Sequence, residues 1–269
     1  MSAAYLALVE ETLSEVLPTS RPLALSDAMR YAVGSGGKRI RPLICLASAR
    51  AVGGTAEDAR YPAAAIELLH NYTLIHDDLP AMDNDVERRG RPTVWKKFGE
   101  ANAILAGDAL LALAYRVAAK APRNVAAIVD VLGEMGVGVV RGQVEDVAAE
   151  LSRGSSDSRT TRTRPADGDA DFIYCHKTAD LFIAAAVMGG LAAGGSEGDV
   201  AALKDFALNL GLAFQYEDDL LDGDGAQSRA ELERRVADST AEALAAVETL
   251  AGETRFLRDL AKKLVGRTA

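Results

Sequence analysis

The stretch HDDLPAMDNDVERRGRPT, from His76 to Thr93, places four aspartates within nine residues directly before a run of arginines. Two carboxylates about 4 Å apart repel by roughly 1 kcal/mol in bulk water and by about 4 kcal/mol at an effective dielectric of 20, so several carboxylates in one cleft need cations. Mg²⁺ suits such oxygen ligands and usually takes one or two carboxylates together with substrate phosphates. Arginine forks bind phosphate oxygens. The stretch therefore predicts a metal and phosphate site, with a solvated acidic turn at a helix end as the alternative.

The composition is that of a soluble globular protein with a substantial core. The chain has 269 residues, of which 49% are hydrophobic and 26% are charged. Its net charge of −9 argues against general nucleic-acid binding. Cys45 and Cys175 are too few for a disulfide framework, and Glu10 and Glu11 stand where a secretory signal needs basic residues. We expect one domain over residues 1–269, located in the cytoplasm.

Apolar residues recur at helical spacing along most of the chain, and no convincing run of alternating β-branched residues occurs. We therefore expect an all-helical fold. The helices are expected over residues 3–17, 25–33, 43–51, 62–79, 99–119, 124–151, from 172 onward, over 200–221, and as a pair within 229–264. The longest apolar stretch, residues 181–195, is shorter than the ~20 residues of a membrane span and predicts a buried helix. The polar residues 152–171 are expected to form a mobile loop.

A second acidic cluster lies at the end of the helix expected over residues 200–221. Asp218 and Asp222 are one helical turn apart, as are Gln215 and Asp219, so this helix has an acidic face on an apolar scaffold. A second cluster is harder to dismiss as a solvated surface than the first alone. The two clusters suggest two helices that face one cavity.

The first cluster needs a break in its helix to act as a unit. Asp77 and Asp83 are six residues apart and would point in different directions on a regular helix, but Pro80 disrupts the hydrogen-bond ladder between them. We expect a distortion that brings both carboxylates to one metal cluster. His70 and Thr73 share a helix face with Asp77. His70 is either part of this site or a satisfied core histidine.

Two further segments could bind phosphate. The motif Gly36-Gly37-Lys38-Arg39-Ile40-Arg41-Pro42 allows close backbone approach to an anion, to which Lys38 and Arg41 could supply charge. A flexible basic loop is the alternative. Lys177, at the start of a later helix, could cap that helix, extend along its apolar surface or reach a phosphate.

Taken in order, these motifs resemble those of the trans-polyprenyl diphosphate synthases, most closely the bacterial farnesyl diphosphate synthases. The matching segments are Gly36–Pro42, His76–Asp85 followed by Arg88-Arg89-Gly90, Lys177-Thr178, and Phe214-Gln215 with Asp218-Asp219 and Asp222. The resemblance implies an all-α isoprenoid synthase fold, a helical bundle around a central cavity, usually a homodimer. It also implies a reaction in which an allylic diphosphate ionises, isopentenyl diphosphate attacks the carbocation, and proton loss leaves a chain five carbons longer.

The resemblance also assigns roles to individual residues. Three magnesium ions on the allylic diphosphate would be held by Asp77, Asp83, Asp218 and Asp222. The allylic substrate would be contacted by Arg88 and by the catalytic group of Lys177, Thr178 and Gln215. The diphosphate of isopentenyl diphosphate would be bound by Lys38, Arg41, His70 and Arg89.

Product length is expected to depend on Tyr72, five residues before the first aspartate, with Thr73 beside it. An aromatic ring there would close the cavity near fifteen carbons, which predicts farnesyl diphosphate made from dimethylallyl or geranyl diphosphate. A geranylgeranyl or geranyl diphosphate synthase is the alternative. A terpene cyclase is disfavoured, because the residues assigned to a second diphosphate would have no use in one.

The sequence departs from the family after Asp222. The family has a lysine-bearing loop there, whereas no lysine occurs between Lys204 and Lys262. The arginines that could substitute are Arg229, Arg234 and Arg235. This departure motivates a further alternative, a catalytically weak homologue that acts as a binding or regulatory subunit.

Overall fold

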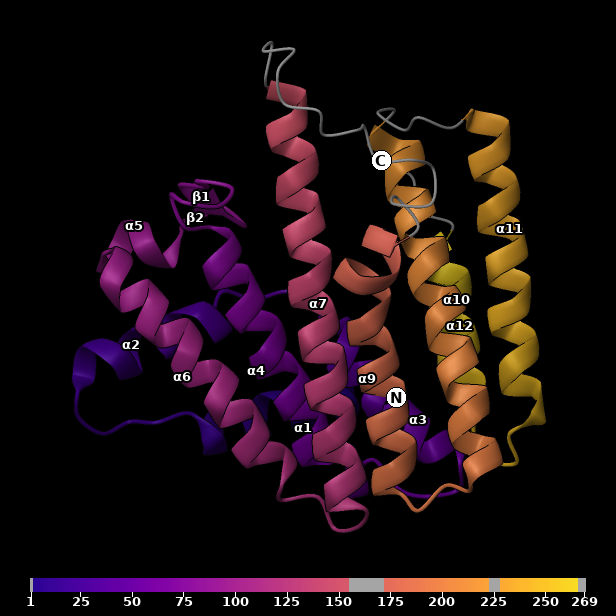
Figure 1. Cartoon of the computed structure of the whole chain (residues 1–269). Coiled ribbons are helices and arrows are strands. Elements are labelled where there is room, and N and C mark those ends of the chain that lie inside the picture. Colours follow the sequence, from indigo (N-terminus) through magenta and orange to yellow (C-terminus); the bar gives the residue numbers. More distant parts are fainter. Residues whose placement is uncertain (1, 155–171, 223–227, 266–269) are drawn as a thin grey trace.

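The computed structural model describes residues 2–154, 172–222 and 228–265, and helices dominate it (Figure 1). The α-helices are α1 Ser2–Val16, α2 Leu23–Val33, α3 Ile40–Ala51, α4 Arg60–Asp77, α5 Val94–Phe98, α6 Glu100–Ala118, α7 Val125–Gly154, α9 Asp180–Ala192, α10 Glu197–Asp222, α11 Arg229–Ala246 and α12 Arg255–Val265. Short 3-10 turns cover Glu57–Ala59 and Val247–Thr249, and a π-helical turn, η2, covers Tyr174–Ala179. The predicted all-α fold is confirmed.

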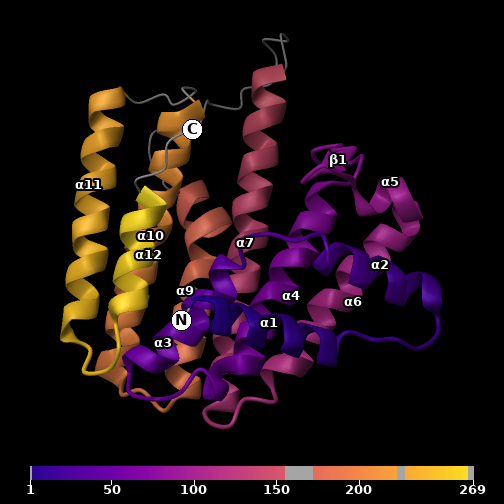
Figure 2. The same cartoon turned by 180° about the vertical axis from the view of Figure 1, so that it is seen from behind.

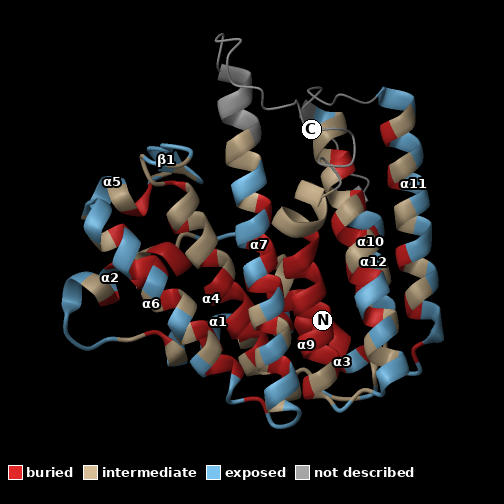
Figure 3. Ribbon diagram, viewed as in Figure 1, coloured by how far each residue is buried: buried red, intermediate tan, exposed pale blue. Residues whose placement is uncertain are grey.

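Helix α9 forms the centre of the bundle (Figure 3). All of its residues except Leu191 are buried, and it packs against α3, α7 and α10. Small side chains allow this close packing, since a Cβ at Gly189 would overlap the carbonyl of Cys45 on α3. The buried helix expected over residues 181–195 is thus confirmed, although it begins one residue earlier and ends at Ala192, three residues earlier.

The acidic clusters lie on α4 and α10, whose C-terminal ends point to the same end of the bundle (Figure 1). The end of α7 and the start of η2 lie at this end too. On the opposite side, α1 runs across the long helices and packs on α3 and α4 (Figure 2). The arrangement therefore gathers the motif-bearing segments at one end of a helical core.

Helix α4 ends at Asp77, two residues before the predicted Leu79, because Pro80 cannot continue the hydrogen-bond ladder. The chain then turns back, and the Asp83 amide donates to the Asp77 carbonyl at 2.9 Å. Beyond it, β1 (Glu87–Arg88) pairs with β2 (Arg91–Pro92) in a short antiparallel hairpin. The sequence did not predict this hairpin, α5 or η2.

Two helices differ from expectation in other ways. Helix α7 continues to Gly154, three residues into the loop expected over 152–171, and residues 155–171 lie outside the described part. Among the described helices, α6 alone is long and apolar enough to cross a membrane by length and composition. Only 39% of its most apolar window is buried within this chain. This leaves an apolar surface on α6.

Candidate active site

The turn after α4 brings Asp77 and Asp83 together as the distortion at Pro80 predicted. Burial raises the pKa of Asp77 to about 6; the charge of Lys177 opposes this shift, and that of Asp83 adds to it. Within the described residues, no three His, Cys, Asp or Glu side chains form a group that could hold a metal ion. A pair of carboxylates suits Mg²⁺ bound jointly with substrate phosphates. The carboxylates of Asp77, at the end of α4, and Asp83, in the turn after it, therefore fit the implied metal.

The neighbouring carboxylates, Asp78 and Asp85, have a different partner. Arg88 donates through Nε to Asp78 Oδ1 at 2.7 Å, and its Nη2 lies 2.6 Å from the same oxygen and 3.3 Å from Asp85 Oδ2. The Asp78 side chain is only 4% exposed. Burial raises the pKa of Asp78, while the bond to Arg88 opposes that shift. Arg88, which was expected to contact the allylic diphosphate, is thus bound by two carboxylates here.

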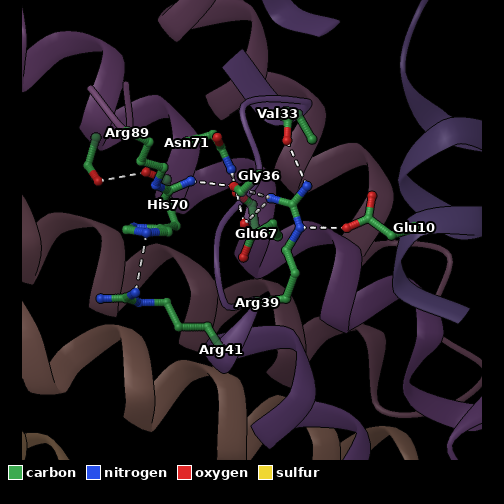
Figure 4. A network of polar contacts seen from close by, with 10 residues as sticks. Glu10, Val33, Gly36, Arg39, Arg41, Glu67, His70, Asn71 and Arg89 are labelled. Carbon is green, nitrogen blue, oxygen red and sulfur yellow. Dashed lines mark hydrogen bonds and ion pairs between the residues drawn. The ribbon is translucent and has the colours of Figure 1, made fainter. Parts of the chain in front are cut away.

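Three of the four residues assigned to isopentenyl diphosphate gather beside the glycine-rich motif (Figure 4). Arg41 Nη1 lies 3.3 Å from His70 Nε2, and Arg89 Nη1 donates to the carbonyl of Gly36. The fourth, Lys38, is exposed on the same loop. A Cβ at Gly37 would lie 2.6 Å from Arg89 Nη1, so the loop needs glycine for the guanidinium to approach. The structure thus gathers Arg41, His70 and Arg89 into a basic group beside the glycine-rich motif, whereas Arg88, the residue before Arg89, pairs with Asp78 and Asp85.

Arg41 and His70 each have a buried nitrogen, Arg41 Nε and His70 Nδ1, with no hydrogen-bond partner among the described residues. Burial lowers the pKa of Arg41 to about 10, and burial together with the charge of Arg41 lowers the pKa of His70 well below its usual range. His70 is therefore neutral at pH 7. Since Arg41 can only donate to Nε2, the proton of this neutral ring is assigned to Nδ1. Two buried donors without acceptors suit an anionic ligand.

Two of the three predicted catalytic residues, Thr178 and Gln215, form a hydrogen-bonded chain between η2 and α10, and the third, Lys177, bonds to α7. Thr178 Oγ1 donates to Gln215 Oε1 at 3.0 Å, and Gln215 Nε2 donates to Asp219 Oδ1 at 3.2 Å. Lys177 Nζ donates to Asp146 on α7. Burial disfavours the charged lysine, but Asp146 together with the charges of Asp77 and Asp83 outweighs burial, and the pKa of Lys177 is raised. Lys177 therefore remains protonated at neutral pH.

Helix α7 shapes η2 through residues spaced four apart, which the sequence analysis did not assign to the site. A Cβ at Gly138 would overlap the side chain of Asp180 at the start of α9, and a Cβ at Gly142 would crowd the backbone nitrogen of Lys177 in η2. Asp146, which accepts from Lys177 Nζ, follows one turn later. The regular spacing of Gly138, Gly142 and Asp146 was a signal that could have identified them. A π-helical turn often marks a functional site.

The second acidic cluster is described only in part. Asp218 is partly buried near the end of α10, and Asp222 is the last residue of that helix, with a side chain outside the described set. Their role as metal ligands stays a prediction. Of the possible lysine substitutes, Arg229 and Arg234 pair with glutamates on α11, at 2.9 and 2.7 Å. Arg235 also reaches α10, where it donates to the Tyr216 hydroxyl at 3.1 Å.

Tyr72 lies on the side of α4 that faces α6. Its ring packs edge-on against His76 with centroids 4.9 Å apart, and His76 Nε2 lies 3.1 Å from the carbonyl of Ile104. A Cβ at Gly107 would overlap the His76 ring, so this packing requires glycine. The Thr73 hydroxyl donates to the backbone carbonyl of His70 at 2.8 Å. Control of product length by Tyr72 and Thr73 stays a prediction.

Known proteins share this arrangement over nearly the whole chain. A polyprenyl synthetase family model matches residues 22–254. A geranylgeranyl diphosphate synthase of Cyanophora paradoxa is 46% identical over 222 residues, which cover 80% of this chain and 71% of that protein. The large subunit 1 of a heterodimeric geranylgeranyl pyrophosphate synthase of Arabidopsis thaliana is 42% identical over 224 residues, or 80% of this chain and 58% of its own length.

A crystal structure of an FPP/GFPP synthase from Zymomonas mobilis matches with a TM-score of 0.84 and 32% identity, covering 98% of this chain and 100% of the other. The match confirms the isoprenoid synthase fold predicted from the motifs. By sequence and by structure, the chain belongs to the polyprenyl synthetase family.

Proposed function

We propose that this protein is a trans-prenyltransferase that joins isopentenyl diphosphate to an allylic diphosphate and releases pyrophosphate. The observation that carries the proposal is the pair of buried, unpartnered donors on Arg41 and His70, because such donors suit an anion and belong to residues other than those of the acidic turn at Asp77 and Asp83. Two such centres suit two diphosphate substrates. A terpene cyclase has one diphosphate to hold and would leave the basic group unused.

The side chains divide the work between the two substrates. Asp77 and Asp83, with Asp218 and Asp222 from α10, would hold three Mg²⁺ ions on the allylic diphosphate. Bound metal ions neutralise the charge that develops on a departing pyrophosphate. Protonated Lys177 adds a fixed positive charge near this end of α4, since it is coupled electrostatically to Asp77.

The remaining residues would bind and orient the substrates. The bond between Thr178 and Gln215 fixes η2 against α10, so that both polar groups keep one orientation toward the allylic substrate. Lys38, Arg41, His70 and Arg89 would bind the diphosphate of isopentenyl diphosphate. Because the chemistry passes through a carbocation, the protein supplies preorganised charge and a dry site rather than a nucleophile.

We propose geranylgeranyl diphosphate as the main product, in place of the farnesyl diphosphate expected from the sequence. The two curated relatives above are both named as geranylgeranyl synthases. Farnesyl diphosphate remains the second candidate because the Tyr72 ring occupies the expected position, packed on His76. The expectation of farnesyl diphosphate rested on that ring alone and is not confirmed.

Purified protein with Mg²⁺ and isopentenyl diphosphate, supplied in turn with dimethylallyl, geranyl and farnesyl diphosphate, tests the activity. Products of twenty carbons support the proposal. A folded protein that yields no prenyl product above background would leave the binding-subunit alternative, and hydrocarbon made without isopentenyl diphosphate would indicate a cyclase.

The same assay on Tyr72→Ala tests the second candidate. If Tyr72 closes the cavity, the wild-type protein makes fifteen-carbon product and the variant makes longer chains, since the barrier has been removed. Unchanged product length in the variant contradicts this account of specificity. Tyr61→Ala, which removes an aromatic ring near the other end of α4 whose hydroxyl donates to Glu15, serves as a control with unchanged product length.

We also propose that the chain forms a homodimer through α6 and α7. Apolar side chains on these helices are exposed at Ile104, Leu105, Val137, Val140 and Val144, the last three at helical spacing on α7. Val137 and Val144 are each 61% exposed. A large exposed apolar surface marks an interaction site. Light scattering is expected to report a dimer for the wild-type protein and a monomer for Val137→Lys/Val144→Lys.

A further inference from the structure

Arg39 lies between Lys38 and Arg41 in the glycine-rich motif, but its side chain is directed into the protein. The side chain is 3% exposed, whereas Lys38 is an exposed residue. The backbone of Arg39 has φ of 49°, a left-handed conformation that is uncommon for residues other than glycine. Such a conformation persists only where the surroundings enforce it. The contacts of the Arg39 side chain provide that enforcement.

The Arg39 guanidinium joins three helices to the loop (Figure 4). It donates to Glu10 Oε1 on α1 and to Glu67 Oε1 on α4, each at 2.7 Å. It also donates to the carbonyl of Val33, at the end of α2, at 2.7 Å and to that of Gly36 at 3.4 Å. The planar guanidinium has five donors in a fixed geometry, so these contacts define one orientation of the turn.

Glu67 is the buried partner of Arg39, and this ion pair forms the anchor of the loop. Its side chain is 4% exposed, and Glu67 Oε1 also accepts from Asn71 Nδ2 at 3.3 Å. Burial disfavours the charged form of Arg39, but the bonds to Glu10 and Glu67 outweigh it and the pKa of Arg39 is raised. Loss of either buried partner leaves an uncompensated charge, so Arg39 and Glu67 hold each other in one arrangement.

Two residues of the basic group, His70 and Arg41, lie close in the sequence to the two residues of this ion pair. His70 lies three residues after Glu67 on α4, and Arg41 lies two residues after Arg39. The Gly36 carbonyl accepts from both Arg39 and Arg89. A shift of the Arg39 side chain would therefore displace the residues proposed to bind isopentenyl diphosphate. Among the described residues, its hydrogen bonds and ion pairs go to Glu10, Val33, Gly36 and Glu67, none of which belongs to η2 or to the turn at Asp83.

We propose that Arg39 is a positioning residue for the diphosphate of isopentenyl diphosphate. It acts by holding the turn at residues 36–41 against α4, and it touches neither substrate. The inference rests on the proposed function, which assigns that diphosphate to Arg41, His70 and Arg89.

The test compares the two substrates in Arg39→Lys and in the double variant Arg39→Met/Glu67→Gln. The double variant removes both charges of this ion pair together, so neither Arg39 nor Glu67 is left without its partner, which favours a folded protein. Glu67→Gln alone is the companion variant, because the charge of Glu67 also acts on Arg41. KM for isopentenyl diphosphate is expected to rise roughly tenfold or more in the double variant, whereas KM for the allylic diphosphate changes by less than about twofold. Arg39→Lys keeps the charge with fewer contacts and is expected to give an intermediate rise.

Arg60→Met is the matched control. Arg60 also links α4 to α1, through Glu15 at 2.9 Å, and binds Glu57 at 2.8 Å, but within the described residues it does not contact the glycine-rich loop. It is expected to leave both KM values unchanged. If the control raises KM for isopentenyl diphosphate as much as the double variant does, the anchor is not specific and the proposal is wrong.

Calorimetric titration of isopentenyl diphosphate, without an allylic substrate, separates this proposal from the proposed function. A wild-type protein that binds isopentenyl diphosphate but makes no product refutes the transferase activity and still allows the affinities of the variants to be compared. Weaker binding by the folded double variant supports positioning by Arg39. Wild-type affinity in that variant, or equal increases in both KM values, overturns it.

Discussion

Replacing Gly142 by alanine is expected to displace Lys177 and Thr178 without changing either residue. A Cβ at Gly142 would lie 2.6 Å from the backbone nitrogen of Lys177 and 3.0 Å from the carbonyl carbon of His176. Non-bonded atoms pack favourably at about 3.5–4.0 Å, so η2 must move away from α7 by about 1 Å. Both clashing atoms belong to the backbone, and no side-chain rotation relieves them.

The expected changes in stability and rate differ in size. Alanine gains about 1 kcal/mol over glycine within a helix, whereas overpacking costs about 1–3 kcal/mol, so Gly142→Ala is expected to range from neutral to about 2 kcal/mol destabilised. A misplacement of about 1 Å can lower a rate by about 100-fold. Urea denaturation measures the free energy of unfolding, and steady-state assays with saturating Mg²⁺ measure kcat.

Gly133→Ala on the same helix is the control. Its Cβ would meet only the Tyr115 side chain, with the hydroxyl at 3.6 Å and Cε1 at 3.8 Å, which are ordinary contacts. This variant is therefore expected to gain about 1 kcal/mol of stability and to keep wild-type turnover. A Gly142→Ala protein with wild-type kcat and unchanged KM for the allylic substrate would refute the view that α7 positions η2.

Two further predictions concern neighbouring packing. Asp146→Asn removes the main group that raises the pKa of Lys177, so this pKa is expected to fall. The alkaline limb of the pH profile of kcat/KM for the allylic substrate should then move to lower pH. An unmoved alkaline limb would show that Lys177 is not required in its charged form. Gly107→Ala forces the His76 ring away from α6 and thereby disturbs the Tyr72 ring packed on it. The distribution of product lengths is therefore expected to change. An unchanged distribution would show that the packing of His76 has no part in chain-length control.

The sequence predicted features that depend on local rules. Apolar spacing and Pro80 defined α4 to within two residues at each end, and the same proline accounts for the pairing of Asp77 with Asp83. The sequence did not predict the π-helical form of η2, nor the close approach of Gly142 on α7 to its backbone, which is a contact between distant segments. Packing between elements, rather than periodicity, determines such details.

The roles of the four clustered aspartates also depend on geometry that spacing does not reveal. Asp77 and Asp78 are adjacent, and near the end of a helix adjacent side chains point about 100° apart. Asp77 consequently lies close to Asp83 and Lys177, whose charges shift its pKa in opposite directions. Asp78 and Asp85 instead form ion pairs with Arg88. Arg88 therefore offsets part of the repulsion that the sequence implied, although Asp78 still repels Asp77 and Asp83 and adds to the effect of burial in raising the pKa of Asp77.

This division leaves Arg88 able to serve the allylic substrate. A guanidinium has five N–H donors, and here Nε and Nη2 bind the two carboxylates. Within the described residues, no hydrogen bond involves Nη1 of Arg88, whose side chain is 31% exposed. Asp78 can therefore hold the guanidinium in place while Nη1 remains available to a phosphate oxygen, so the ion pair and the predicted substrate contact are compatible.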